Sequence, residues 1–277
     1  MEIQKALTIF FNEDVQDGDH TSLATIPAEA ERQAQLIVKD EGVIAGVELA
    51  ENIFHFVDKS LIIDHFIKDG TNVKHGDIAF TVKGKAQSLL KAERIVLNLM
   101  QRMSGIATLS RQFANKVSDL STKILDTRKT TPGIRYFEKW AVRIGGCHNH
   151  RMGLYDMIMI KDNHHDYAGG IIKAIDRTYD YLKEKNLSLK VEIEVRNLEE
   201  LKIVVEDGRV DRIMLDNFSP EAIKEALQQI PSSFETEASG GINLETVRAY
   251  AETGIQYVSV GALTHSVKSL DMSLKAF

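Results

Sequence analysis

The sequence lacks cysteine pairs, long apolar runs and an excess of positive charge, and each absence excludes a class of protein. Cys147 is the single cysteine among 277 residues, so an internal disulfide framework is excluded and a reducing compartment is indicated. No apolar run approaches the roughly 20 residues of a membrane-spanning helix. The N-terminus lacks a basic segment followed by an apolar one, which a secretory signal requires. We therefore expect a soluble, cytoplasmic protein.

The charge balance argues against a general nucleic-acid binder. The chain carries 34 Lys and Arg against 40 Asp and Glu, a formal net charge of −6, whereas nucleic-acid binding needs a net basic surface. Basic residues nevertheless gather between residues 128 and 163, among Pro-Gly and Gly-Gly turns. The cluster comprises Arg128, Lys129, Arg135, Lys139, Arg143, His148, His150, Arg151 and Lys161. A local basic cluster in an acidic chain indicates a small anionic ligand, with a plain basic surface loop as the alternative.

The length suggests about two domains, and the first hundred residues have a mixed pattern. A helix is expected over residues 2–12, followed by an acidic turn in which Asp19, Thr21 and Ser22 favour helix capping over metal binding. A helix is expected over 47–57. The strand-like runs are 34–38, 43–45, 61–67 and 78–82. This part of the chain shows little chemistry of its own.

From residue 88 the apolar spacing becomes helical. Apolar residues recur at spacings of three and four positions over residues 89–103, which predicts a helix. Ser104-Gly105 is expected to interrupt it before a second helix that begins at Ile106. Arg94 stands beside Glu93 on the first helix, and physical reasoning alone makes it an exposed cation or half of a local ion pair.

Beyond residue 120, strand and helix patterns alternate. The expected strands are 123–126, 156–160, 191–195, 212–215, 235–238 and 257–260, with a weaker seventh near 141–144. The expected helices are 169–185, 198–206, 220–229 and 244–252. Repeated strand–helix units predict a parallel sheet, and so many of them suggest closure into a barrel.

Charged residues and glycines follow these strands at their C-terminal ends. They are Arg128, Lys129, Lys161, Glu194, Asp216, Ser239, Gly240, Gly241 and Gly261. In a barrel that rim collects catalytic groups, and the last two loops commonly bind phosphate. Individually the residues allow plainer interpretations, because Glu194 could pair with a barrel lysine and Asp216 could cap the next helix.

The remaining reactive side chains give weaker signals. His164 and His165 are expected in a loop rather than at a metal. His148 and His150 have no carboxylate at ligand spacing, which disfavours zinc. Cys147 has no clear base partner and is interpreted as a small buried thiol.

Several long motifs in a fixed order make this chain resemble the quinolinate phosphoribosyltransferases. They are EDVQDGDHTS, ERIVLNLMQRMSGIAT, TRKTTPGIR, NHR, IKDNH, VEIEV, MLDNF, ASGGI and VGALTHS. The resemblance implies an N-terminal α/β sandwich domain (1–105) and a partly irregular, TIM-like α/β barrel (106–265), with about 266–277 as a candidate to pack back on the first domain. It also implies a homodimer whose active sites are completed by the neighbouring subunit. Cys147 departs from the family, which often has a third glycine there.

The reaction implied by the resemblance joins quinolinate to phosphoribosyl pyrophosphate and releases pyrophosphate and CO2, giving nicotinate mononucleotide for NAD biosynthesis. The implied quinolinate contacts are Arg128, Lys129, His150, Arg151 and Lys161, with Arg94 from the partner subunit. Glu194 and Asp216 are expected to face the ribose and Mg2+, directly or through water, and no organic cofactor is expected. Lys129, Lys161, Glu194 and Asp216 are the candidate catalytic residues. Ser239, Gly240, Gly241 and Gly261 are expected to bind the 5′-phosphate.

Three other hypotheses compete with this one. Lys161 could be the nucleophile of a Schiff-base lyase built on the same rim. The protein could be a non-catalytic binder of anionic metabolites, although such a binder gains nothing from Glu194 and Asp216. A related phosphoribosyltransferase acting on another aromatic acid is the nearest rival.

Overall fold

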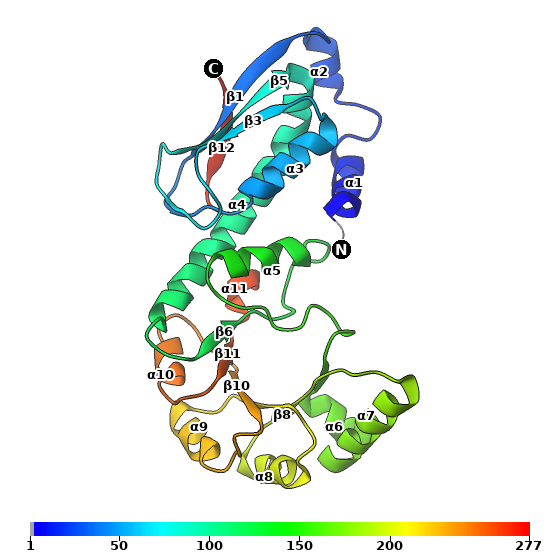
Figure 1. Cartoon of the computed structure of the whole chain (residues 1–277), viewed down its shortest axis with the longest axis vertical. Coiled ribbons are helices and arrows are strands. Elements are labelled where there is room, and N and C mark those ends of the chain that lie inside the picture. The colour runs from blue at the N-terminus through cyan, green and yellow to red at the C-terminus, as the bar shows by residue number, and fades with distance from the viewer. Residues whose placement is uncertain (1–2) are drawn as a thin grey trace. The chain divides into compact units, whose positions relative to one another are not determined.

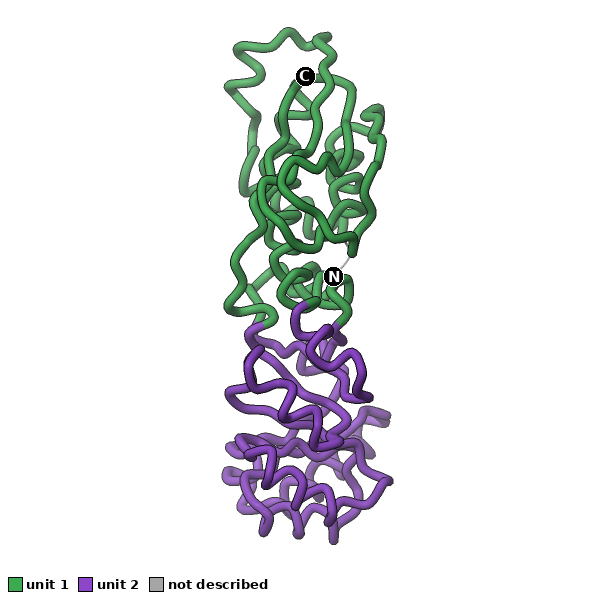
Figure 2. Tube along the Cα trace, turned by 90° about the vertical axis from the view of Figure 1, so that its left-hand side faces the viewer, with its two compact units in different colours: residues 1–111, 130–146, 263–277 green, residues 112–129, 147–262 purple. Residues whose placement is uncertain are grey.

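The computed structural model describes residues 3–277 and divides the chain into two compact units (Figure 2). Unit 1 comprises residues 1–111, 130–146 and 263–277, and unit 2 comprises 112–129 and 147–262. Each unit has its own sheet. Among the described residues no helix is both long and apolar enough to cross a membrane.

Unit 1 is built on an antiparallel sheet of four strands. Their order is β12 (Met272–Ala276), β1 (Glu31–Val38), β5 (Ile78–Lys85) and β3 (Ile62–His65). The C-terminal strand β12 and the early strand β1 lie side by side, red against blue in Figure 1. The unit's remaining short elements are α1 (Ile3–Asp14), α2 (His20–Thr25), α3 (Val47–Val57) and the pair β2 (Gly42–Val43) and β4 (Asn72–Val73). Asp19 caps α2 by accepting from the amide of Ser22 at 3.1 Å, so the capping interpretation of the acidic turn is confirmed.

Two sequence-based expectations in unit 1 are wrong. Helix α4 (Ala86–Lys116) runs through Ser104 and Gly105 without a break. A side chain on Gly105 would place Cβ 2.3 Å from the carbonyl oxygen of Lys268, so this glycine allows close packing and does not end the helix. The weak strand near 141–144 belongs instead to helix α5 (Arg135–Ile144), whose apolar residues recur at four-residue spacing.

Unit 2 contains a parallel sheet of six strands. Their order is β6 (Lys123–Leu125), β11 (Tyr257–Ser259), β10 (Glu235–Ser239), β9 (Arg212–Asp216), β8 (Val191–Val195) and β7 (Ile158–Ile160). The helices α6 (Asp162–Ala168), α7 (Ile171–Lys185), α8 (Leu198–Asp207), α9 (Pro220–Leu227) and α10 (Val247–Ala251) alternate with them, and the short α11 (Ala262–His265), which follows β11, leads back into unit 1. The strands are rich in β-branched and apolar residues, as expected for a sheet covered on both faces. The predicted fold class, an α/β protein of two domains, is thus confirmed.

The parallel sheet is extended at one edge but does not form a continuous barrel ladder. On the free side of β6, Leu125 and His148 form a parallel bridge, so the chain from His148 to Arg151 continues the strand order. Within residues 3–277 no further ladder joins this segment to β7 at the other edge. The break in the ladder falls at the loop that precedes β7.

Candidate active site

The C-terminal ends of parallel strands meet at one edge of a sheet, and most of the predicted site residues follow those ends. Glu194 on β8 is 5% exposed, and its Oε2 lies 2.8 Å from Nζ of Lys161, which follows β7. Lys161 itself is exposed and is the N-cap residue of α6, where its amide donates to Nδ1 of His164 at 2.8 Å. The two strand ends therefore place a carboxylate and an ammonium in direct contact. This is also the lysine pairing that the plainer interpretation of Glu194 anticipated.

Asp216 is held in place by the next strand end. Its Oδ1 accepts from Ser239 Oγ at 2.6 Å and its Oδ2 accepts from Asn217 Nδ2 at 2.6 Å. It does not cap the following helix, because the hydroxyl of Ser219 accepts the amide of Ala222 there. The alternative of a capping role for Asp216 is therefore wrong.

The Ser239-Gly240-Gly241 turn closes on this carboxylate. Gly240 has φ +98°, and a Cβ there would lie 2.2 Å from Oδ1 of Asn217. Asn217 itself has φ +57°, and its amide donates to the carbonyl of Ser239 at 2.9 Å. The glycine is thus required both by conformation and by close approach, which gives a tight turn with backbone amides at a strand end, a geometry suited to an anion.

Two arginines lie close to each other at the open edge of the sheet. Burial lowers the pKa of the Arg151 guanidinium, and the nearby charge of Arg128 lowers it further. Nη1 of Arg151 donates to the carbonyl of Met157 at 2.9 Å. Arg128 and Lys129 are exposed. Like charges at close range repel, so a bound anion would stabilise this pair.

His150 is directed into the interior of unit 2 rather than away from it. Its ring Nδ1 accepts the amide of Arg151 at 2.7 Å, and its Nε2 lies 3.0 Å from Glu192 Oε2 and 3.4 Å from Glu237 Oε2. The amide of His150 donates to the buried carboxylate of Asp126 at 2.9 Å. With a residue exposure of 9%, His150 is a structural centre of the site.

We call His150, Glu192, Glu237 and Arg212 the inner cluster. Arg212 Nη1 lies 2.8 Å from Glu237 Oε2, and its guanidinium stacks over the ring of Tyr257 at 4.1 Å. Each glutamate stands two residues before a rim residue on its strand, so its side chain points to the same face one layer deeper.

The inner cluster strongly perturbs its own ionisation. Burial opposes the charged form of His150, whereas the two carboxylates favour that form and act to raise its pKa. Burial and the charge of Glu237 raise the pKa of Glu192, whereas His150 and Arg212 outweigh burial at Glu237 and lower its pKa. The carboxylates thus favour a cationic imidazole, while the Arg151 amide at Nδ1 favours the neutral ring with its proton on Nε2. The 2.7 Å contact at Nδ1 leaves no room for a second ring proton, so we assign the neutral form.

Comparison with known proteins identifies the lineage of this site. A model of the N-terminal domain of quinolinate phosphoribosyl transferase matches residues 19–104, and a model of the C-terminal domain matches residues 106–275. The chain belongs to the quinolinate phosphoribosyltransferase family.

Relatives cover nearly the whole chain. The chloroplastic nicotinate-nucleotide pyrophosphorylase [carboxylating] of Arabidopsis thaliana is 49% identical over 93% of this chain and 78% of its own length. The probable nicotinate-nucleotide pyrophosphorylase [carboxylating] of Bacillus subtilis is 42% identical over 99% of this chain and 93% of its own. The crystal structure of NadC from Streptococcus pyogenes matches with a TM-score of 0.92 at 38% identity, over 99% of this chain and 95% of that one. The family resemblance read from the motifs is confirmed.

Arg94 stands apart from the other predicted site residues of this family member. It is exposed on α4 in unit 1, whereas the remaining predicted site residues all lie in unit 2. Its contribution to a neighbouring subunit's site stays a prediction.

The magnesium ion that the resemblance implies would suit the rim carboxylates better than the inner cluster. Mg2+ prefers oxygen ligands and keeps several waters, which Glu194 and Asp216 at the strand ends allow. His150, Glu192 and Glu237 also bring three ligand atoms within 4.8 Å of one another. That set, however, is fully buried, and the guanidinium of Arg212 already supplies positive charge to it.

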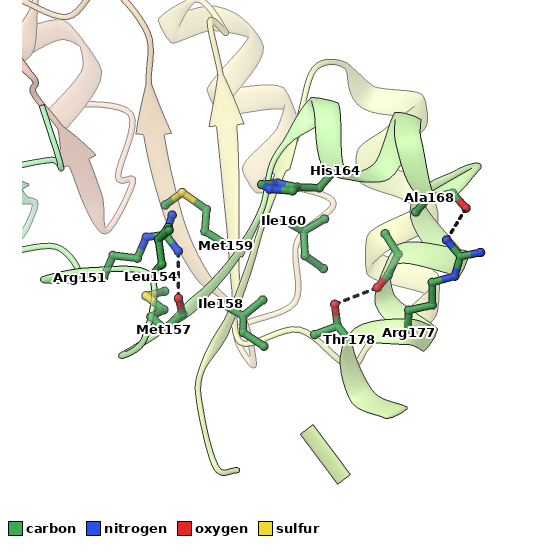
Figure 3. Close-up of a pocket in the computed structure, with 11 residues that line it drawn as sticks. Arg151, Leu154, Met157, Ile158, Met159, Ile160, His164, Ala168, Arg177 and Thr178 are labelled. Carbon is green, nitrogen blue, oxygen red and sulfur yellow. Dashed lines mark hydrogen bonds between the residues drawn. The ribbon is translucent and has the colours of Figure 1, made fainter. Parts of the chain in front are cut away.

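A mostly apolar cavity of about 320 Å³ lies along β7. Figure 3 shows Arg151, bonded to the carbonyl of Met157, at one end and Arg177, bonded to that of Ala168, at the other. His164 also lines it, in helix α6 and not in the loop expected for it. Arg151 is the one predicted substrate contact among the lining residues, so this cavity does not enclose the charged rim.

Sequence reasoning overlooked Glu192, Glu237, Arg212 and Asp126. A signal was present, because the glutamates of Glu-Ile-Glu on β8 and of Glu-Thr-Glu on β10 stand two positions apart, which places the glutamates of each strand on one face. Glu192 and Glu237 stand two positions before the rim residues, so a search limited to the last residue of each strand does not find them.

Proposed function

We propose that this protein transfers a phosphoribosyl group from phosphoribosyl pyrophosphate to quinolinate, with decarboxylation, to give nicotinate mononucleotide. The observation that carries the proposal is the like-charged pair Arg128 and Arg151 on the rim that also holds Glu194 and Asp216. A pair of cations suits a dicarboxylate, and carboxylates suit a ribose that becomes positively charged. The names of the relatives support the same reaction.

Quinolinate is a planar ring with two adjacent carboxylates. In our assignment the guanidiniums of Arg128 and Arg151 hold these groups, because their forked donors match a carboxylate bidentately. Lys129 and Lys161 add positive charge. His150 supports this set through the amide of Arg151. The arrangement presents the ring nitrogen to the sugar and restricts its rotation, which lowers the entropic part of the barrier.

The ribose side is assigned to the carboxylates and the glycine turn. Ser239, Gly240, Gly241 and Gly261 bind the 5′-phosphate with backbone amides and a hydroxyl. Glu194 and Asp216 lie beside the ribose, where their charge stabilises the oxocarbenium-like transition state formed as pyrophosphate departs. Magnesium, when bound with the substrate, neutralises charge on the pyrophosphate.

Decarboxylation follows from the charge of the product ring. Once the nitrogen carries the ribose, the ring is cationic and accepts the electron pair left by CO2 at the adjacent carbon. A proton then replaces the carboxylate at that carbon. No covalent bond to the enzyme is formed. Nζ of Lys161 is paired with Glu194 at 2.8 Å, and a Schiff-base lyase would have to release this amine before it could attack a carbonyl.

The test is a product assay with purified protein, magnesium and phosphoribosyl pyrophosphate. Quinolinate labelled in the carboxylate beside the ring nitrogen should yield nicotinate mononucleotide and labelled CO2 in equal amounts. Nicotinate should be a poor substrate, because a single carboxylate leaves a desolvated cation unpaired at a cost of roughly 2–5 kcal/mol. Equal turnover of both acids would contradict the assignment. Borohydride trapping of a carbonyl substrate on Lys161 would favour the lyase.

A further inference from the structure

Apart from His150, the inner cluster has no part in the chemistry described so far, yet the cluster contains four charged or titratable residues in the interior of unit 2. Glu192 and Glu237 are fully buried, and Arg212 is 8% exposed. Burying charges in such density is costly unless each group is paired and oriented. Because this cluster lies one layer below the rim, its contacts can hold rim residues in place.

The contacts form a chain that leads from the interior to the rim. Arg212 contacts Glu237 at 2.8 Å, and Glu237 and Glu192 lie 3.4 and 3.0 Å from Nε2 of His150. The opposite ring nitrogen, Nδ1, accepts the amide of Arg151 at 2.7 Å. The imidazole therefore lies between two carboxylates at Nε2, which are at ion-pair distance without hydrogen-bond geometry, and a hydrogen-bonded amide at Nδ1. That amide belongs to Arg151, which is assigned to substrate binding.

We propose that Glu192 and Glu237 are positioning residues, which hold the imidazole of His150 so that its Nδ1 fixes the backbone of Arg151 and hence its guanidinium. The proposal deepens the proposed function and rests on it for the ligand of Arg151. Because Nδ1 accepts a hydrogen bond, the ring proton is on Nε2, and that proton needs an acceptor on its other side. The carboxylates supply the acceptor. Substrate-binding groups are held accurately only when a second layer of contacts locks them.

Two variants that make the same Glu→Gln change at different positions distinguish this role from general structural support. Glu192→Gln keeps the shape of the side chain but allows an amide to donate to Nε2, which would move the ring proton to Nδ1 and oppose the amide of Arg151. Glu235→Gln is the control, because Glu235 pairs with Arg212 of the inner cluster at 2.8 Å, whereas the carboxylates beside Nε2 of His150 are those of Glu192 and Glu237. Long-range 15N–1H NMR spectra of the histidine rings, assigned with a His150→Asn variant, report which nitrogen carries the proton.

We expect Glu192→Gln to change the His150 ring signal and to raise the KM for quinolinate about tenfold, with a smaller effect on kcat. Glu235→Gln should match the wild type in both readouts. In the His150→Asn background, Glu192→Gln should add no further loss, because its effect passes through the ring. An equal loss in that background, or a wild-type KM in Glu192→Gln, would overturn the proposal.

A replacement variant and a measurement on the wild-type protein keep the proposal testable. If Glu192→Gln does not fold, Glu237→Gln replaces it with the same expected readouts. The ring spectrum of the ligand-free wild type must show a proton on Nε2 and none on Nδ1, and the reverse overturns the proposal whatever the variants do. Failure of the wild type to convert quinolinate would instead sink the proposed function, while the ring spectrum would still decide the positioning.

Discussion

Glu194 and Asp216 end adjacent strands, but their neighbours differ. Glu194 is buried against the ammonium of Lys161, whereas Asp216 accepts hydrogen bonds from Ser239 and Asn217. The proposed function separates both carboxylates, on the ribose side of the rim, from Arg128 and Arg151, on the quinolinate side, and Glu194 also contacts Lys161 of the quinolinate set.

This separation predicts how charge removal changes the kinetics. Glu194→Gln and Asp216→Asn keep shape but remove the charge that stabilises the ribose in the transition state. Each should lower kcat by about two orders of magnitude and leave the KM for quinolinate nearly unchanged. Asp166→Asn, an exposed carboxylate paired with Arg196, is the control and should have wild-type kinetics. A large rise in the KM for quinolinate with kcat retained would show that these carboxylates act in quinolinate binding and would contradict their assignment to the ribose.

Gly240 allows a second prediction at the scale of one residue. Gly240→Ala must place Cβ 2.2 Å from the side chain of Asn217 and adopt φ +98°, so the turn has to shift. We expect the KM for phosphoribosyl pyrophosphate to rise about 10- to 100-fold, the equivalent of roughly 1–3 kcal/mol of strain.

The control for that variant is Gly254→Ala. Gly254 has φ +88°, but nothing lies within 4 Å of an added Cβ. This variant should lower stability a little and leave the KM unchanged. Equal effects of the two variants would show that backbone strain alone, and not the contact with Asn217, explains the result.

At the scale of the element, helix α3 is capped from a distance. Its own N-cap residue, Gly46, makes no side-chain cap, and Asp69 Oδ1 accepts the amide of Val47 at 2.8 Å. Burial raises the pKa of Asp69 above the ordinary 3.8, although backbone amides oppose that change. A raised folded-state pKa means that the folded state retains the proton better than the unfolded state does. The stability from this group is therefore complete below about pH 3.8 and is lost as the pH rises through the folded-state pKa.

Asp69→Asn should remove that pH dependence while keeping an acceptor for Val47. The free energy of unfolding of Asp69→Asn, relative to the wild type, should increase between pH 3.5 and pH 7 in urea titrations. Asp69→Ala leaves the amide without its acceptor and should cost about 1–2 kcal/mol at both pH values. A constant difference between wild type and Asp69→Asn across this range would show that Asp69 has an ordinary pKa in the folded protein.

The elements also show where sequence reasoning succeeds and where it fails. Helix α3 and strand β8 have the predicted bounds, because their apolar patterns match their periods without conflict. The break at Gly105 was wrong because a glycine can also serve the approach of another segment, here at Lys268, which no local pattern shows. Helix α5 was missed because its apolar run is too short to separate strand from helix.

The rim was accessible to sequence reasoning because parallel strands deliver their last residues to a common edge. For the inner cluster, alternation along β8 and β10 indicates which side chains share a face, but not which of them meet across β8, β9 and β10. Register decides that, pairing Glu192 with Arg212 and Arg212 with Glu235. Nothing local in the sequence sets a register between strands that are 20 residues apart.

At the scale of the whole molecule, the unexplained residue is Arg94. Physical reasoning gives it no role, since it is an exposed arginine on α4. The family resemblance assigns it to the quinolinate site of a neighbouring subunit in a homodimer. Arg94→Ala and Arg151→Ala should then each be nearly inactive, because each removes a bidentate partner of a carboxylate.

Mixing the two inactive variants tests this assignment directly. In a mixed dimer one site combines the intact Arg151 of one chain with the intact Arg94 of the other, and the second site carries both lesions. Random exchange of equal amounts makes about half of the dimers hybrid, each with one intact site, so roughly a quarter of wild-type activity should return. If Arg94 served its own chain, every site would keep one lesion and no activity would return. Exchange must be verified with differently tagged chains, because dimers that never dissociate would also show no recovery.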